Sequence, residues 1–265
     1  AAEPSGEVYV FIAASLANAM EDIQKDFNQK YPDVEIFYNA DSSGTLQTQI
    51  EEGSRCDIFF SAATKQMDAL VEEKLAKEES VVNLLENKVV LIKTKDTETR
   101  VTGFENITEA ENLALAGEDV PVGQYAREIF TNLDIMDQVE AMEINEGKNV
   151  TEVLAAVTQG SNEVGVVYAT DAASVADQVE IIAEASSDML ETPVLYPVGM
   201  IEDEEALPEE KVAAETFFEY LQTENALKVF EEHGFSPYTA EVEENDTEEA
   251  EDTQADQKTD SETGE

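Results

Sequence analysis

The amino-acid sequence predicts an α/β protein built from two lobes. Short apolar, β-branched segments alternate with segments whose apolar residues recur every three to four positions, which is typical of strands alternating with helices. A length of 265 residues with 42% hydrophobic residues suffices for two such lobes. After two series of this kind, a late strand and two helices lead back, which predicts strands that cross between the lobes.

The first series begins with an apolar strand, EVYVFIA, and a helix whose stripe includes Leu16, Ile23 and Phe27 and which ends before Pro32. Alternation of this kind favours parallel strands joined by right-handed crossovers. The expected elements are a strand at 7–13, a helix at 15–31, a strand at 33–40, a helix at 43–53, a strand at 56–62 and a helix at 64–75.

The second series contains a helix with Pro121 in its first turn and another that ends at Gly160. Its expected strands cover 87–94, 112–117, 163–169 and 179–185, and its helices cover 121–133 and 149–160. A returning strand at 194–201 and closing helices at 208–222 and 223–234 follow.

These segments divide the chain into parts. We expect a linker at 1–6, a first lobe from 7–86 with 199–240, and a second lobe at 87–198. The crossing strands are expected near 87–90 and 195–198. Residues 241–265 hold twelve acidic residues and almost no apolar ones, so they are predicted to form a disordered acidic tail.

Charge and composition exclude several functions. The formal net charge is -46, and -35 of it remains on the first 240 residues, so nucleic acid is not an expected partner. We favour a role of this acidity in solubility over a calcium-binding tail, because the tail lacks EF-hand spacing. The single cysteine, Cys56, is expected to be an inert core thiol, and the single histidine, His233, has no partner ligands for a metal. No apolar run reaches the roughly 18 residues that span a bilayer.

Four segments place a small or hydroxyl residue where a helix opens, and a fifth ends a strand with a tyrosine. The first N–H groups of a helix have no partner within it, and the helix dipole favours an anion there without any lysine or arginine. Several such starts aimed at one point would hold a dianion. The candidate residues are Ser15, Ser43, Val122, Val150 and Tyr168.

Each candidate also has a simpler interpretation. Ser15 and Ser43 would serve equally as helix N-caps, Val122 and Val150 as first-turn packing residues, and Tyr168 as a core tyrosine. Only the combination favours a site for a small doubly charged oxyanion.

The same segments resemble the periplasmic molybdate-binding proteins, the substrate receptors of the molybdate ABC transporter. The resemblance runs in order over roughly residues 7–235. It is carried by VFIAASLANAMEDI, SSGTLQTQIEEGSRCDIFFSA, VPVGQYARE, VGVVYATDA and FFEYLQTENALKVFEEHGF.

This resemblance implies a two-lobed periplasmic-binding-protein type II fold, with two crossing strands as its hinge and the ligand in the cleft between the lobes. It implies hydroxyl donors at Ser15, Ser43 and Tyr168 and backbone N–H donors at Ser15, Ser43, Val122 and Val150. The family often has alanine where Val122 stands. Asp41, beside the second segment, is a further departure, because a carboxylate there weakens anion binding unless it points away.

The implied protein is an extracytoplasmic, monomeric receptor without a cofactor that binds molybdate or tungstate and delivers it to an ABC transporter permease. Fixed neutral donors would select a large, fully deprotonated oxyanion. The alternatives are a related receptor for sulfate or another anion, and an enzyme on the same scaffold. A carboxylate receptor would need an arginine in the cleft, and neither Arg55 nor Arg127 is well placed. An enzyme is not expected, because a histidine base, a nucleophile elbow and a metal cluster are all missing from the pattern.

Overall fold

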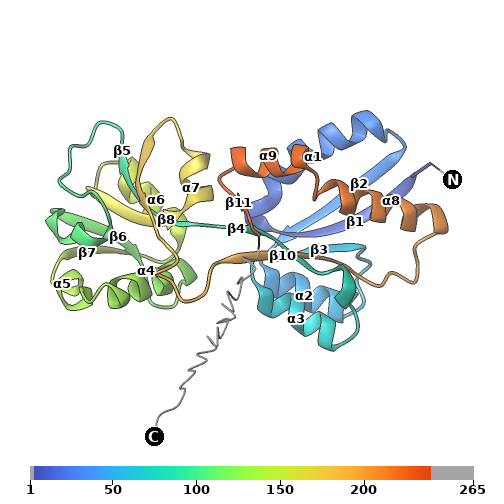
Figure 1. Cartoon of the computed structure of the whole chain (residues 1–265), viewed down its shortest axis with the longest axis horizontal. Helices are drawn as coiled ribbons and strands as arrows, with labels where there is room; N and C mark the ends of the chain where they lie inside the picture. Colours follow the sequence, from blue (N-terminus) through green and yellow to red (C-terminus); the bar gives the residue numbers. More distant parts are fainter. Residues whose placement is uncertain (1–2, 240–265) are drawn as a thin grey trace, which may run out of the picture.

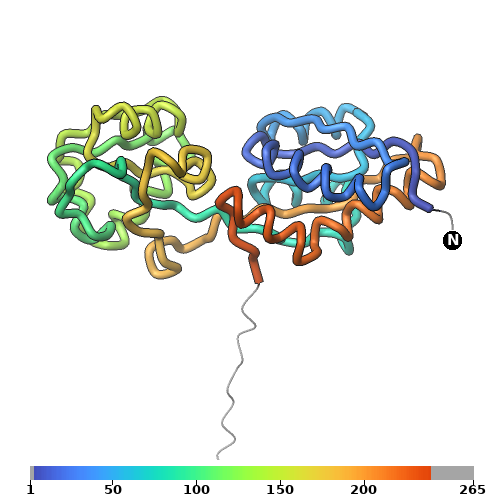
Figure 2. Tube along the Cα trace, turned by 90° about the horizontal axis from the view of Figure 1, so that it is seen from above, coloured from blue at the N-terminus to red at the C-terminus, as the bar shows by residue number. Residues whose placement is uncertain are grey.

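The structure, a computed structural model that describes residues 3–239, divides the chain between two sheets, each covered by helices (Figure 1). The two-lobed α/β architecture predicted from the sequence is therefore confirmed. The lobes lie side by side along the long axis and are joined by thin connections (Figure 2). The predicted acidic tail at 241–265 lies outside the described residues.

The first lobe has six strands in the order β11-β4-β10-β3-β1-β2. Its strands are β1 (Gly6–Ala13), β2 (Val34–Asp41), β3 (Ile58–Phe60), β4 (Val82–Glu86), β10 (Leu195–Met200) and β11 (Ser236–Pro237). Its helices are η1 (Ala14–Leu16), α1 (Ala17–Lys30), α2 (Ser43–Glu51), α3 (Thr64–Glu72), η2 (Glu78–Ser80), α8 (Pro208–Tyr220) and α9 (Glu224–Glu232).

Alternation of side chains along β1 explains why this sheet lies between two layers of helices. Val10 and Ile12 point into a core formed with α1, α8 and α9, whereas Phe11 points into a smaller core formed with α2 and α3. Cys56 belongs to this smaller core, and burial raises the pKa of its thiol, as expected for an inert cysteine.

The second lobe has five strands in the order β7-β6-β8-β5-β9 around one core. Its strands are β5 (Val89–Thr94), β6 (Asn112–Ala116), β7 (Glu143–Gly147), β8 (Val164–Tyr168) and β9 (Val179–Glu184). Its helices are η3 (Phe104–Glu109), α4 (Pro121–Asn132), α5 (Met136–Glu140), α6 (Val150–Thr158) and α7 (Ala169–Ser174).

Both sheets are mixed: the parallel strands expected for the first series are confirmed, and antiparallel strands join them. β1, β2 and β3 are parallel, as are β6, β7 and β8. β10 runs antiparallel to β3 and β4, and β5 runs antiparallel to β8 and β9. The physical reason is that the chain reaches β5 and β10 directly from the other lobe. These two strands therefore start at the crossing and run away from it, whereas the parallel strands run toward it.

The chain crosses between the lobes at residues 87–88 and again at 185–194. The two crossings lie side by side, because the N–H of Asn87 donates to the carbonyl of Val194 at 3.0 Å and that of Ala185 donates to Val89 at 2.8 Å. The second lobe was expected to extend to residue 198. That boundary needs correction, since Leu195–Met200 already pairs with β3 and β4 in the first sheet.

Candidate functional site

The strand directions bring the C-terminal ends of both parallel sets to the crossing between the lobes. β4 runs into the crossing, and β10 is antiparallel to both β4 and β3, so β3 and its parallel neighbour β1 also end there. In the second lobe β5 starts at the crossing, with Val89 opposite Tyr168 at the end of β8, and β6 and β7 are aligned with β8. Two rows of strand ends therefore face each other, which is where open α/β sheets bind ligands.

The first lobe contributes the two predicted serines at this edge. Ser43 is the first residue of α2, and its Oγ accepts a hydrogen bond of 2.9 Å from the N–H of Ala62, which follows β3. The N-cap of α2 is Ser42, whose Oγ accepts from the N–H of Thr45 at 3.3 Å. The N-cap interpretation of Ser43 is therefore wrong, and its side chain instead ties the ends of β2 and β3 together.

Ser15 lies in η1, directly after β1, and caps neither η1 nor α1. Its side chain is exposed at the edge of the sheet, and its Oγ lies 2.8 Å from the hydroxyl oxygen of Tyr196 on β10. An exposed hydroxyl with one bonded neighbour retains capacity for a further hydrogen bond to a ligand.

The second lobe contributes two helix starts in addition to Tyr168. Val122 is the second residue of α4, after Pro121, and Val150 is the first residue of α6, which Asn149 caps by accepting from the N–H of Glu152 at 2.9 Å. The Val122 side chain is buried, as the packing interpretation expects, so only its backbone N–H is available. At both starts the first N–H groups have no partner within their own helix, and α4 and α6 follow β6 and β7, whose C-terminal ends lie on the side of the crossing.

Tyr168 ends β8 and lies where the lobes meet. It packs against the cores of both lobes, and its ring lies 6.5 Å from that of Tyr125 in α4 in an edge-on arrangement. Within residues 3–239 no hydrogen bond joins Ser15 or Ser43 to the three candidates of the second lobe. The predicted donors therefore lie on two facing edges, here called candidate half-sites, with Tyr168 where the lobes meet.

The structure adds three residues that the sequence analysis missed. Tyr196 bonds to Ser15, and the side-chain amide of Asn87 in the first crossing donates to Tyr196 at 3.3 Å and to Thr170 of α7 at 3.0 Å. Asn87 and Tyr196 were predicted as parts of strands, and nothing in their local pattern distinguishes them. Only the tertiary contact between the crossing, β10 and η1 reveals their connection to the site.

The charged groups near these edges leave the half-sites to neutral donors. Arg127 in α4 donates to the carbonyl oxygens of Ala116 at 2.7 Å and Gly123 at 2.9 Å, so it is held by backbone and is not directed at a ligand. Asp41 is exposed and accepts from the N–H of Ser42 at 2.7 Å. Asp171 accepts from the N–H of Tyr168 at 2.9 Å, and burial raises its pKa to about 6.

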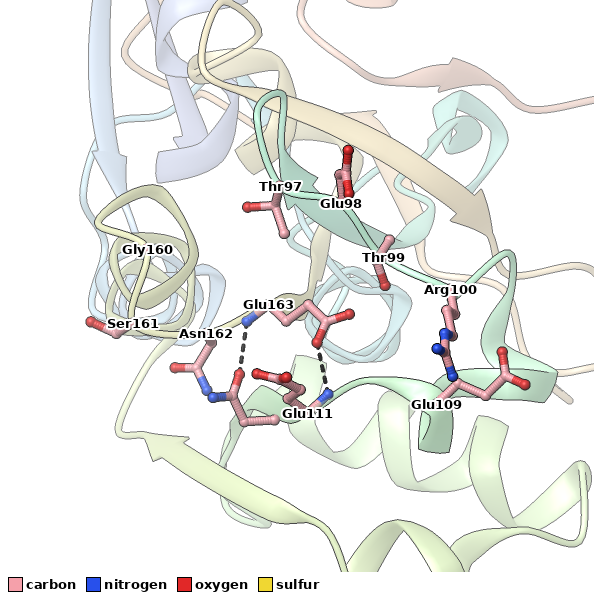
Figure 3. A pocket seen from close by; sticks show the side chains of 11 residues that line it. Thr97, Glu98, Thr99, Arg100, Glu109, Glu111, Gly160, Ser161, Asn162 and Glu163 are labelled. Carbon is pink, nitrogen blue, oxygen red and sulfur yellow. Dashed lines mark hydrogen bonds between the residues drawn. The ribbon is translucent and has the colours of Figure 1, made fainter.

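A large cavity elsewhere does not suit an anion. It has a volume of about 700 Å³, lies beyond the opposite end of the second sheet, and includes Glu98, Glu109 and Glu111 in its lining (Figure 3). Glu163 there accepts from the N–H of Glu111 at 2.7 Å. A wall this rich in carboxylates repels an oxyanion, and no group of residues among those described has the geometry to hold a metal ion.

Known proteins are similar to this chain over most of its length. The model of the bacterial extracellular solute-binding proteins matches residues 8–236. A putative ABC transporter substrate-binding lipoprotein of Bacillus subtilis (strain 168) is 41% identical over 226 residues, covering 84% of this chain and 84% of that protein. The molybdate-binding protein ModA of Haemophilus influenzae is 35% identical over 238 residues, covering 88% and 91%.

A solved structure is also similar. The substrate binding domain of a putative molybdenum ABC transporter from Clostridium difficile matches with a TM-score of 0.79 and 34% identity, covering 88% of this chain and 99% of that one. Two α/β lobes joined by two adjacent crossings form the fold of a two-lobed solute-binding protein. The chain belongs to the family of bacterial extracellular solute-binding proteins, in the group of the periplasmic molybdate-binding proteins. None of the helices described between residues 3 and 239 is long and apolar enough to cross a bilayer.

Proposed function

We propose that this protein is an extracytoplasmic receptor that binds molybdate or tungstate between its lobes and delivers it to an ABC transporter permease. The observation that carries the proposal is the pair of facing half-sites built from hydroxyl and backbone N–H donors without a cationic side chain. The donors are Ser15, Ser43, Val122, Val150 and Tyr168. The molybdate-binding relatives that match over most of the chain support the choice of ligand.

The chemistry of the donors supports selection of a fully deprotonated dianion. N–H groups offer no acceptor to a protonated ligand, and charge-assisted hydrogen bonds in a desolvated cleft contribute about 1.5–3 kcal/mol each. The protein carries a formal charge of -46, so long-range attraction does not assist binding and the short-range donors must supply the affinity. The transport receptors among the relatives support a role in binding rather than catalysis.

The test is a thermal-unfolding series with molybdate, tungstate, sulfate and phosphate at equal concentration. A ligand at about 100 times its dissociation constant stabilises the folded state by about 2.7 kcal/mol. We expect molybdate and tungstate to raise the unfolding temperature by several degrees and sulfate and phosphate to leave it almost unchanged. An equal rise with sulfate would instead identify a general oxyanion receptor. No rise with any of the four would refute the proposal.

A further inference from the structure

A chain of hydrogen bonds runs from the first crossing to the exposed hydroxyl of Ser15. The side-chain amide nitrogen of Asn87 lies 3.3 Å from the hydroxyl oxygen of Tyr196, which lies 2.8 Å from the Oγ of Ser15. Asn87 is 2% exposed and Tyr196 is 4% exposed, so neither side chain exchanges its partners with water. The protein itself therefore determines which group donates in each of these hydrogen bonds.

The orientation of the Asn87 side-chain amide sets the direction of the first hydrogen bond in this series. Its Nδ2 donates to the hydroxyl oxygens of Thr170 and Tyr196, and its Oδ1 has no partner in the described part of the chain. The reversed amide would satisfy the carbonyl but bury two N–H groups without acceptors. Because one unpaired carbonyl costs less than two unpaired donors, the amide nitrogen faces Tyr196.

This orientation determines where the proton of Tyr196 points. The phenolic oxygen already accepts from Asn87, so its own proton needs an acceptor. Within residues 3–239, the acceptor at hydrogen-bonding distance is the Oγ of Ser15. If Ser15 donated instead, the buried Tyr196 would hold an unpaired proton. Tyr196 therefore donates, Ser15 accepts, and the proton of Ser15 remains free for the cleft.

We infer that Asn87 and Tyr196 are positioning residues that make Ser15 a hydrogen-bond donor toward the bound anion. The inference rests on the proposed function, since it concerns the same site. With the opposite direction, Ser15 would give its proton to Tyr196 and turn its lone pairs toward the oxyanion, which is repulsive. The direction of this relay, from Asn87 through Tyr196 to Ser15, decides whether the Ser15 hydroxyl attracts or repels the ligand.

Asn87→Asp reverses the relay while nearly preserving shape, because a carboxylate only accepts. Tyr196 then donates to position 87, and Ser15 donates to Tyr196. We expect the molybdate dissociation constant of N87D to rise by about 30-fold or more. Part of that loss is repulsion by the new charge, which a second substitution separates from the relay.

Tyr196→Phe breaks the relay and provides this separation. Y196F alone leaves the Ser15 proton free but less well oriented, and we expect a loss of about 3-fold. The double variant N87D/Y196F keeps the new charge but no longer forces Ser15 to donate away from the cleft. We expect it to bind molybdate about 5-fold or more tighter than N87D, a rescue that a purely structural role of Asn87 does not produce.

The measurement is calorimetric titration with molybdate of the wild type, N87D, Y196F, N87D/Y196F and Ser15→Ala, after thermal unfolding without ligand has shown that each is folded. Rescue by Y196F supports the relay. A double variant as weak as N87D or weaker overturns it, and so does an N87D variant with wild-type affinity. Absence of binding by the wild type refutes the proposed function instead.

If N87D does not fold, Y196F and S15A decide the question. Tyr196 acts through Ser15, so S15A/Y196F should bind molybdate as S15A does, within about 2-fold. Losses that add in full would overturn the relay.

Discussion

In the proposed site, the two lobes contribute different kinds of hydrogen-bond donor. The first lobe presents side chains: the hydroxyls of Ser15 and Ser43, each fixed by a hydrogen bond to another element of that lobe. The second lobe presents mainly backbone: the first N–H groups of α4 and α6, whose positions depend on how the helices pack on the sheet, with Tyr168 as its one hydroxyl donor. The donors at the first edge therefore depend on which residues stand there, and the N–H donors at the second edge depend on where the helices begin.

This difference predicts which substitutions change ligand binding in each lobe. A hydroxyl removed from the first lobe removes a donor directly. A side chain changed at Val150 leaves the N–H in place, so the residue's identity has little effect. Conversely, a substitution that shifts a helix start moves several donors together, even though no donor group has been deleted.

The largest effect is expected at Gly123, where α4 approaches the end of β6. A Cβ at this position would collide with the carbonyl oxygens of Gly117 and Ala116, which are backbone atoms and cannot swing away. Gly123→Ala should displace the start of α4 and abolish most molybdate stabilisation, with about 1–3 kcal/mol lost from the free energy of unfolding. Urea unfolding with and without molybdate measures both effects.

Gly44 provides the matched control in the first lobe. It is also the glycine of an early helical turn, but a Cβ there would meet nothing within 4 Å. Gly44→Ala should leave stability within about 1 kcal/mol and preserve the molybdate effect. If G123A behaved like G44A, the close approach of α4 to β6 would not matter, and the proposed role of helix placement would be wrong.

The next prediction compares the molybdate affinities of the Ser43→Ala and Val150→Ala variants. Loss of the Ser43 hydroxyl removes a donor and also the acceptor of the Ala62 N–H, so molybdate affinity should fall about 10-fold or more. Val150→Ala retains its backbone N–H, and its affinity should stay within about 2-fold. Calorimetric titration of both variants checks the contrast, and equal losses would contradict the assignment of a side-chain donor to Ser43 and a backbone donor to Val150.

The same difference explains which features could be predicted from the sequence. Helix starts are local, so the positions of Ser43, Val122 and Val150 followed from periodicity, Pro121 and turn residues. β7 was missed because it is an edge strand with mostly exposed polar side chains. Strand direction at β5 and β10 could not be read locally, since it depends on which lobe the chain comes from.

The residues of the candidate site could also be predicted only where their signal is local. The role of Asn87 arises from contacts with Thr170 and Tyr196, which lie 83 and 109 residues away in the chain. Periodicity identifies such residues as strand or connection and nothing more. Contacts between crossings are tertiary, and a single sequence carries no local signal for them.

The last comparison concerns the pH dependence of stability, which differs between the lobes. In the first lobe, burial and the neighbouring Asp203 raise the pKa of Asp57 to about 7, and in the second, burial raises that of Asp171 to about 6. Both carboxyls are more easily protonated in the folded state. The stability that they contribute is present below their unfolded pKa, near 3.8, and is lost as pH rises through the folded values.

Asp57→Asn and Asp171→Asn separate this dependence from the general repulsion of an acidic protein, which all variants share. Each asparagine can still accept from the N–H that its aspartate binds, that of Tyr9 or Tyr168. In the wild type the free energy of unfolding should fall as pH rises. In D57N this fall should be smaller by about 1–3 kcal/mol over the range up to about pH 7. In D171N the fall should be reduced by less, and only up to about pH 6. Urea unfolding from pH 4.5 to 8 measures it, and an unchanged slope in D57N would show that its carboxyl does not titrate with folding.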